Sequence, residues 1–183
     1  MAQETVSGGR SFEMPEHCRF CRMAVIEKRE PTEVVVNDKM QKNYRYMLTE
    51  PEGKNFHPDF KPELTPIQIF EGKYMTDCWE EFPEEWFEHA ILSPEKSNPL
   101  YNYFGVKSRL SLNEWRRRGW IVGPDVRGWF QWYCRYYYGR RLPEADEIQI
   151  KRWRSFRRHL AQVEKNCMPL DVACRTRQRQ ALL

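Results

Sequence analysis

The sequence predicts a mainly α (α+β) fold, a compact helical domain with an aromatic core and a small β-hairpin near the N-terminus. Aromatic residues number 26 among 183, and 14 of them lie between Tyr101 and Phe156. Apolar residues recur at helical spacing in the second half, whereas residues 33–48 alternate as a strand does. A chain of this length fits one domain and can bury about 70% of its unfolded surface.

We expect a leader followed by one globular unit. Residues 1–16 contain Gly8-Gly9 and show no apolar periodicity, which predicts a disordered leader. Residues 17–66 predict an irregular N-terminal region, and residues 67–183 predict the helical aromatic-core domain that forms one unit with it. The chain ends inside the apolar run Ala181-Leu182-Leu183, as a truncated helix would.

The β-hairpin is predicted from a β-branched run followed by a turn and an alternating segment. Val34-Val35-Val36 is the run, and Asn37-Asp38 is a turn signal. Tyr44, Tyr46 and Leu48 then alternate with larger polar or flexible side chains. The two short strands should therefore pair, with one face of the hairpin towards the core.

Prolines and glutamates organise the middle of the chain. Residues 54–66 contain three prolines and predict an extended connector without regular structure. Pro83 suits the first position of a helix, and Glu84 and Glu85 would favour the dipole in its first turn. We expect Trp86 to help dock this helix through pairs of apolar side chains four residues apart.

A capping box predicts a short helix further on. Ser111 and Glu114 are three residues apart, so that each can satisfy the other's free backbone N–H. Gly119 would end the helix. Three consecutive arginines, residues 116–118, cannot share one helix face. We expect some of them to pair with the acidic half of the chain and at least one to face solvent.

The segment Gly128 to Arg141, GWFQWYCRYYYGRR, predicts the central helix of the core. At about 100° per residue, the broad apolar side carries Trp129, Trp132, Tyr133, Tyr136 and Tyr137. The narrow polar strip on the other side carries Arg127, Gln131, Arg135 and Tyr138. Gly139 supplies the left-handed position at which helices commonly stop.

The next predicted helix, Glu144 to Asn166, carries the most informative charge pattern. Its buried stripe is Ile150, Trp153, Phe156, Leu160 and Val163. Almost diametrically opposite lies a line of cations, Lys151, Arg154, Arg158 and Lys165, which we call the basic ridge. Arg152 and Arg157 flank it. A last helical segment, residues 170–183, contains three further arginines.

The net charge of +4 conceals a strong asymmetry. Residues 1–104 carry 12 Lys/Arg and 19 Asp/Glu, whereas residues 105–183 carry 18 and 7, so the two parts have net charges of −7 and +11. Such a basic half indicates a polyanionic partner. The alternative is that the acidic half neutralises the basic half within one folded body.

The cysteines are interpreted through the expected compartment. No run of 18 apolar residues and no N-terminal apolar signal core is present, so we expect an intracellular protein, nuclear or cytoplasmic, without a membrane partner. Six cysteines then predict thiols or metal ligands rather than disulfides. Cys18 and Cys21 have the Cys-x2-Cys spacing of half a zinc site, which Cys167 and Cys174 could complete. Zinc is the one candidate cofactor.

Four stretches of this chain resemble a family of proteins without an assigned activity. They are NYFGVKSRLSLNEWRRRGW, RGWFQWYCRYYYGRR, QIKRW and CRTRQRQALL. The resemblance runs from about Phe70 to the C-terminus and leaves out the Cys-x2-Cys region. Its motifs are long and specific, but it implies no catalytic residue, substrate or cofactor.

The sequence favours nucleic-acid binding, DNA or RNA, over two alternatives. The predicted contact residues are Arg127, Arg135, Tyr138, Arg140, Arg141, Lys151, Arg154 and Arg158, with Tyr138 stacking on a base. One alternative is an enzyme acting on nucleic acid or a phosphorylated substrate, with Cys134, His159 or the Asp77/Glu81 cluster in its site. No P-loop, GxGxxG, HExxH or GxSxG pattern supports it. The other is a protein-interaction module whose charges pair internally.

Overall fold

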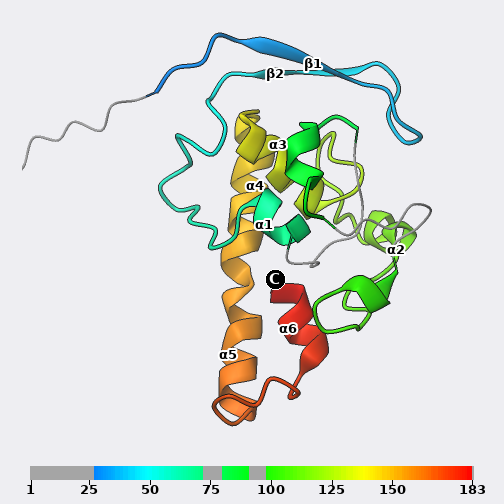
Figure 1. The fold of residues 1–183 in the computed structure, drawn as a ribbon, viewed down its shortest axis with the longest axis vertical. Helices are drawn as coiled ribbons and strands as arrows, with labels where there is room; N and C mark the ends of the chain where they lie inside the picture. The colour runs from blue at the N-terminus through cyan, green and yellow to red at the C-terminus, as the bar shows by residue number, and fades with distance from the viewer. Residues whose placement is uncertain (1–26, 72–79, 91–97, 183) are drawn as a thin grey trace, which may run out of the picture.

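The computed structural model describes residues 27–71, 80–90 and 98–182 and confirms the predicted fold class, mainly α with a small antiparallel hairpin. The elements are β1 (Thr32–Val36), β2 (Tyr44–Leu48), α1 (Pro66–Glu71), the 3-10 turns η1 (Glu84–Phe87) and η2 (Pro99–Tyr101), α2 (Leu112–Arg117), α3 (Trp129–Tyr138), α4 (Pro143–Ser155), α5 (Arg157–Asn166) and α6 (Thr176–Leu182). In Figure 1, α4 and α5 form one long column. The hairpin crosses one end of the molecule, and the connection between α5 and α6 lies at the other.

The hairpin has the predicted strands and the predicted alternation. β1 and β2 pair antiparallel, with Val34 opposite Tyr46, and Val36, Tyr46 and Leu48 are buried. The hairpin is joined to the end of α3, because the backbone N–H groups of residues 49 and 50 both donate to the Gly139 carbonyl at 3.0 and 3.1 Å. The strands therefore pack on the main helix rather than standing apart.

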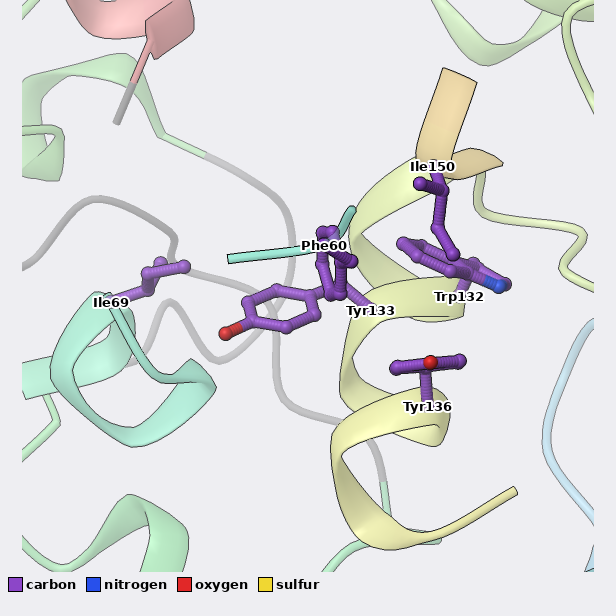
Figure 2. Close-up of a cluster of buried hydrophobic side chains, with 6 residues drawn as sticks. All are labelled: Phe60, Ile69, Trp132, Tyr133, Tyr136 and Ile150. Atoms are coloured by element: carbon purple, nitrogen blue, oxygen red, sulfur yellow. The ribbon is translucent and has the colours of Figure 1, made fainter. Parts of the chain in front are cut away.

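The aromatic side of α3 forms the core, as predicted. Trp132, Tyr133 and Tyr136 are at most 2% exposed and surround Phe60, with ring centroids 5.3 to 5.5 Å from that of Phe60 (Figure 2). Phe60 comes from the proline-containing segment, so this largely exposed segment contributes one ring to the centre of the core. Gly139, at φ +118°, ends α3 in the left-handed region.

The connector is free of helix and strand up to residue 65, as predicted, but the helix that follows it is not predicted, and the prediction of a full helix after Pro83 is wrong. The proline-containing connector runs directly into a helix, α1, which Thr65 and Gln68 cap by exchanging hydrogen bonds between side chains and backbone N–H groups. The helix expected after Pro83 is a single 3-10 turn, η1. Its Trp86 is 1% exposed and stacks on Phe82 with ring centroids 5.1 Å apart, so packing rather than helix length holds this segment.

The short helix α2 begins as predicted, with the Ser111 hydroxyl accepting from the Glu114 N–H at 3.2 Å. Within the residues that the structure describes, its arginines do not pair with the acidic half of the chain. Arg117 and Arg118 both bind Glu114 of the same helix, at 2.6 and 2.5 Å. Spacings of three and four residues bring these groups together on the helix surface, so the local partner prevails.

The long helix predicted over residues 144–166 is interrupted at Phe156, which separates α4 from α5. Ile150 and Val163 are buried as predicted, whereas Phe156 and Leu160 are 36% and 46% exposed. The prediction of a continuous buried stripe is therefore wrong. In Figure 1, α5 runs beyond the main body of the fold, beside α6.

The last helix begins later than predicted, at Thr176, because a disulfide-closed loop precedes it. Length and apolarity together would allow a helix to span a membrane, and none of the helices in the described ranges has both.

Candidate nucleic-acid interface

The basic ridge lies on the exposed side of α4 and α5. Lys151, Arg154, Arg158 and Lys165 are all exposed, as is the flanking Arg157, whereas Ile150 and Val163 are buried. The cations are exposed on both helices, but on α5 this exposure does not mark one side, because every residue of α5 except Val163 is exposed.

Within the described residues, Arg154 is the ridge member with a carboxylate partner. Its Nη1 lies 3.0 Å from Oδ2 of Asp59, and the two side chains are 59% and 55% exposed. A pair this exposed contributes only about 0–1 kcal/mol and is easily displaced. Glu147, which is also exposed, precedes Lys151 by one helical turn, so the uniformly positive part of the ridge starts at residue 151.

Arg135 and Arg140, predicted to contact phosphate, are instead buried, and that prediction is wrong. Their side chains are 0% and 1% exposed. Arg135 donates to both carboxylate oxygens of Glu81 at 2.8 and 2.9 Å and to Asp125 at 2.9 Å. Arg140 donates to both oxygens of Asp125 at 2.8 and 2.7 Å. The amide oxygen of Gln41 accepts a further bond from Arg135 at 2.7 Å.

This buried network is electrically balanced, with two guanidinium groups and two carboxylates. The rings of Tyr44 and Tyr46 lie 4.9 and 5.4 Å from the Arg135 guanidinium carbon, in cation–π contact. Burial alone would lower the pKa of Arg135, but the hydrogen bonds and charges of Glu81 and Asp125 raise it, so the guanidinium stays charged. The network belongs to the interior of the fold, and a polyanion cannot reach its guanidinium groups.

Arg127 and Arg141 are also engaged by the protein. Arg127 pairs with Asp38 at 2.6 Å, with both side chains less than 20% exposed. Arg141 donates to the Tyr136 and Lys54 carbonyls at 2.6 and 2.9 Å and lies over the Tyr136 ring. Both side chains are thus partly buried and already bound within the fold, and their role as phosphate contacts stays a prediction.

Tyr138 was predicted to stack on a base, and the structure contradicts this. Its half-buried ring lies 5.6 Å from that of Trp86, and the Arg29 guanidinium carbon is 5.5 Å from the ring centroid. Arg29 also donates to the Tyr138 carbonyl at 3.1 Å. A nucleobase would have to displace these groups to reach the ring.

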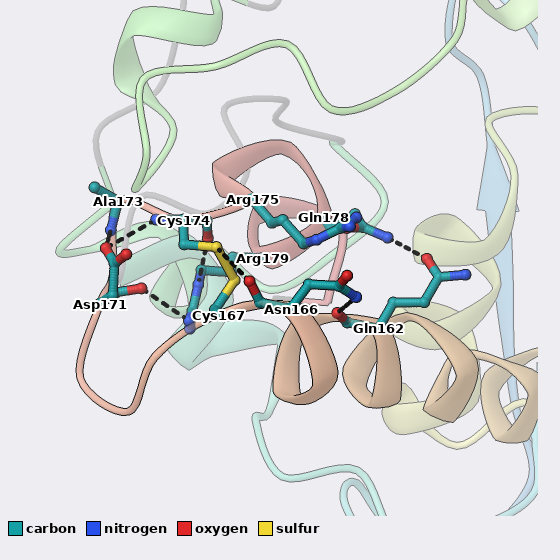
Figure 3. Close-up of a disulfide and its surroundings, with 9 residues drawn as sticks. All are labelled: Gln162, Asn166, Cys167, Asp171, Ala173, Cys174, Arg175, Gln178 and Arg179. Atoms are coloured by element: carbon teal, nitrogen blue, oxygen red, sulfur yellow. Dashed lines mark hydrogen bonds between the residues drawn. A yellow bond between two sulfur atoms is a disulfide. The ribbon is translucent and has the colours of Figure 1, made fainter.

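The cysteine prediction is corrected at one of its two ends. Cys167 and Cys174 form a disulfide (Figure 3), so neither sulfur is a thiolate that could bind zinc. Cys18 and Cys21 lie outside the described residues. In the described part of the chain, His, Cys, Asp and Glu side chains do not gather in threes or more at a spacing that would hold a metal ion.

The candidate catalytic groups do not converge in the described part of the chain. Cys134 is fully buried, and burial, assisted by the charge of Glu81, raises the pKa of its thiol well above the ordinary value. Glu81 is bound to Arg135, while His159 is exposed on α5 beside Phe156. Asp77 lies outside the described residues. Among these described groups, no nucleophile lies beside a general base as an active site would require.

Two arginines near the ridge were missing from the predicted contact set. Arg175, just before α6, and Arg177, in its first turn, are both exposed, and α6 packs against α5. Alternating arginines in CRTRQRQALL are the signal in the sequence, but the fold is needed to bring them beside α5. These two arginines therefore add positive charge at the end of the molecule where α5 and α6 lie side by side (Figure 1).

Searches with models of protein families, among curated proteins and among solved structures gave no match to this chain. The resemblance to a family without an assigned activity stays a prediction. The function has to be inferred from the geometry and charge of the chain itself.

Proposed function

We propose that the protein binds nucleic acid, DNA or RNA, through the basic ridge of α4 and α5. The observation that carries the proposal is that the cations fall into two groups. One group is buried against carboxylates, and the other is exposed on the ridge. Four lie in line on one exposed helical face, and three of these, Lys151, Arg158 and Lys165, have no carboxylate partner in the described residues. Like charges one turn apart destabilise a helix by a few tenths of a kcal/mol, a cost that a bound polyanion would remove.

The ridge fits recognition of the phosphate backbone rather than of base sequence. Residues 151–165 span about 21 Å along the helix axis. This equals the axial length of about six nucleotides in one strand of B-form DNA. Four cations on this length can each neutralise a phosphate, which gives affinity without sequence preference. The proposal places the protein in the nucleus or cytoplasm, where such polymers occur.

A protein-interaction module is the second candidate, and two observations favour it. Pairs such as Arg135–Glu81 and Arg127–Asp38 neutralise part of the charge asymmetry inside the fold. In addition, the connection between α5 and α6 exposes three apolar side chains, Met168 at 75%, Leu170 at 96% and Val172 at 65%. Exposed apolar groups of this kind favour contact with another protein.

The first test is a charge reversal on the ridge. We expect Lys151→Glu/Arg158→Glu to bind a labelled 20-nucleotide single strand about 100-fold more weakly than the native protein at 50 mM salt, because two phosphate contacts are lost. Fluorescence anisotropy measures the affinity.

The matched control is Lys39→Glu/Lys42→Glu, which makes the same change in net charge on two exposed lysines of the turn between β1 and β2. It should keep nearly the native affinity. Equal losses in the two variants would show that net charge, not the ridge, attracts the nucleic acid. Binding that neither variant weakens would contradict the proposal.

A further inference from the structure

The disulfide Cys167–Cys174 closes a loop that has little other support. The loop exposes Met168, Leu170 and Val172, so it contributes almost no apolar burial. Its hydrogen bonds are local: the Asp171 carboxylate accepts from the Ala173 and Cys174 N–H groups, both at 3.1 Å (Figure 3). Both cysteines are half-buried rather than enclosed in the core. The covalent bond therefore provides much of the order of this loop.

Helix α6, which follows the loop, is equally dependent on its neighbours. It has seven residues, of which Gln180 is buried, and helices this short are not stable by themselves in water. Arg179 ties α6 to the loop by donating to the Cys174 and Asp171 carbonyls at 2.8 and 3.0 Å. Opening the disulfide would loosen the loop and the start of α6 together.

The disulfide also positions Arg175, the residue that follows Cys174. Its Nη1 donates to the Gln178 side-chain oxygen at 2.7 Å, and Gln178 donates in turn to the Gln162 side chain on α5. Gln162 lies four residues after Arg158 and three before Lys165, which makes it their neighbour on the helix surface. Figure 3 shows this relay from Arg175 to α5 beside the two sulfur atoms.

We propose that Arg175 is a further phosphate contact that extends the basic ridge, and that the Cys167–Cys174 disulfide controls the affinity by holding it there. This inference rests on the proposed nucleic-acid binding. In a reducing compartment the dithiol form would prevail, and oxidation would strengthen binding. The redox state of the Cys167–Cys174 loop would thus determine whether Arg175 adds a phosphate contact to those of the ridge.

The switching step is a thiol–disulfide exchange with a dithiol. A thiolate of the reductant attacks one sulfur, the S–S bond breaks, and the other cysteine leaves as a thiolate that takes a proton. The second thiol of the reductant then displaces the first cysteine from the mixed disulfide. Two electrons and two protons pass to Cys167 and Cys174, and the reductant becomes a disulfide.

The test compares oxidised protein with protein treated with dithiothreitol, using the labelled 20-nucleotide strand and counting free thiols in both states. At 50 mM salt we expect the reduced protein to bind about tenfold more weakly, which corresponds to one lost phosphate contact. Oxidised Arg175→Gln should show the same loss and little further response to the dithiol. Arg177→Gln, also exposed on α6 but outside the relay to Gln162, is the matched control and should keep the redox response.

The possible outcomes separate the two proposals. Salt-sensitive binding that is equal in both redox states overturns the redox inference and leaves the ridge standing. An oxidised protein that does not bind overturns the proposed function itself. A redox response that persists in Arg175→Gln shows that the disulfide acts through other residues and contradicts the role of Arg175. Cys167→Ser/Cys174→Ser should match the reduced protein and ignore the dithiol; if this variant does not fold, the native protein with and without dithiol still decides.

Discussion

Asp125 is the shared carboxylate that holds two arginines in the interior of the fold. Its side chain is 0% exposed and accepts hydrogen bonds from both Arg135 and Arg140. A guanidinium with such partners is locked in the interior, whereas a chemically identical group on Arg158 faces solvent. At the scale of single residues, the burial of Arg135 and Arg140 thus depends on carboxylates that the fold brings to them.

Removing this shared carboxylate should be costly. We expect Asp125→Asn to lower the free energy of unfolding by about 3–5 kcal/mol, because two buried guanidinium groups lose part of their compensating charge. Urea denaturation followed by circular dichroism measures the change. Asp59→Asn, which removes the exposed partner of Arg154, is the control and should cost less than about 1 kcal/mol. A similar small effect in both variants would contradict the structural role of the network.

Elements that depend on local patterns were predictable from the sequence, and those that depend on distant partners were not. The hairpin, α2 and α3 follow from alternation, a capping box and a helical aromatic stripe. The ridge follows from the same periodicity. The burial of Arg135 could not be predicted, because Glu81 and Gln41 lie 54 and 94 residues away in the chain.

The missed and misplaced elements have identifiable physical reasons. The reciprocal cap between Thr65 and Gln68 is visible in the sequence, but the surrounding prolines favoured an extended segment. The start of α6 was placed too early because a disulfide loop takes up residues that could otherwise be helical. An intracellular compartment favours reduced cysteines, so the sequence predicts thiols or metal ligands at Cys167 and Cys174 rather than a disulfide.

At the element scale, the junction between α3 and the hairpin depends on Gly139. A Cβ atom at this position would lie 2.0 Å from the Glu50 carbonyl oxygen, and φ is +118°. We expect Gly139→Ala to destabilise the protein by more than about 2 kcal/mol through clash and backbone strain. Chemical denaturation measures it.

Gly119→Ala is the matched control for this prediction, because φ there is +65° and a Cβ would have no atom within 4 Å. It should cost about 1–2 kcal/mol from the left-handed conformation alone. If the two substitutions had equal effects, the close approach of the hairpin to α3 would not be important for stability.

At the scale of the whole molecule, the acidic half of the chain neutralises only some of the cations of the basic half. Arg127 and Arg135 pair with carboxylates of the first half of the chain, which consumes part of the excess. The cations of the ridge lie along α4 and α5, and Arg175 and Arg177 lie near the start of α6, which is beside α5 at the end of the molecule away from the hairpin (Figure 1). A nucleic acid bound on α5 and near α6 would not contact the hairpin, whose packing on α3 stabilises the fold.

The most direct test of this account is the salt dependence of binding by the native protein and by Lys151→Gln/Arg158→Gln. In the reduced protein, the four phosphate contacts of the ridge predict that log K falls against log salt concentration with a slope of about −3.6 on duplex DNA and about −2.8 on a single strand. The variant should have a slope smaller by about 1.8 or 1.4, since it lacks two contacts. Affinity that does not change with salt, or equal slopes for the two proteins, would contradict binding through the ridge.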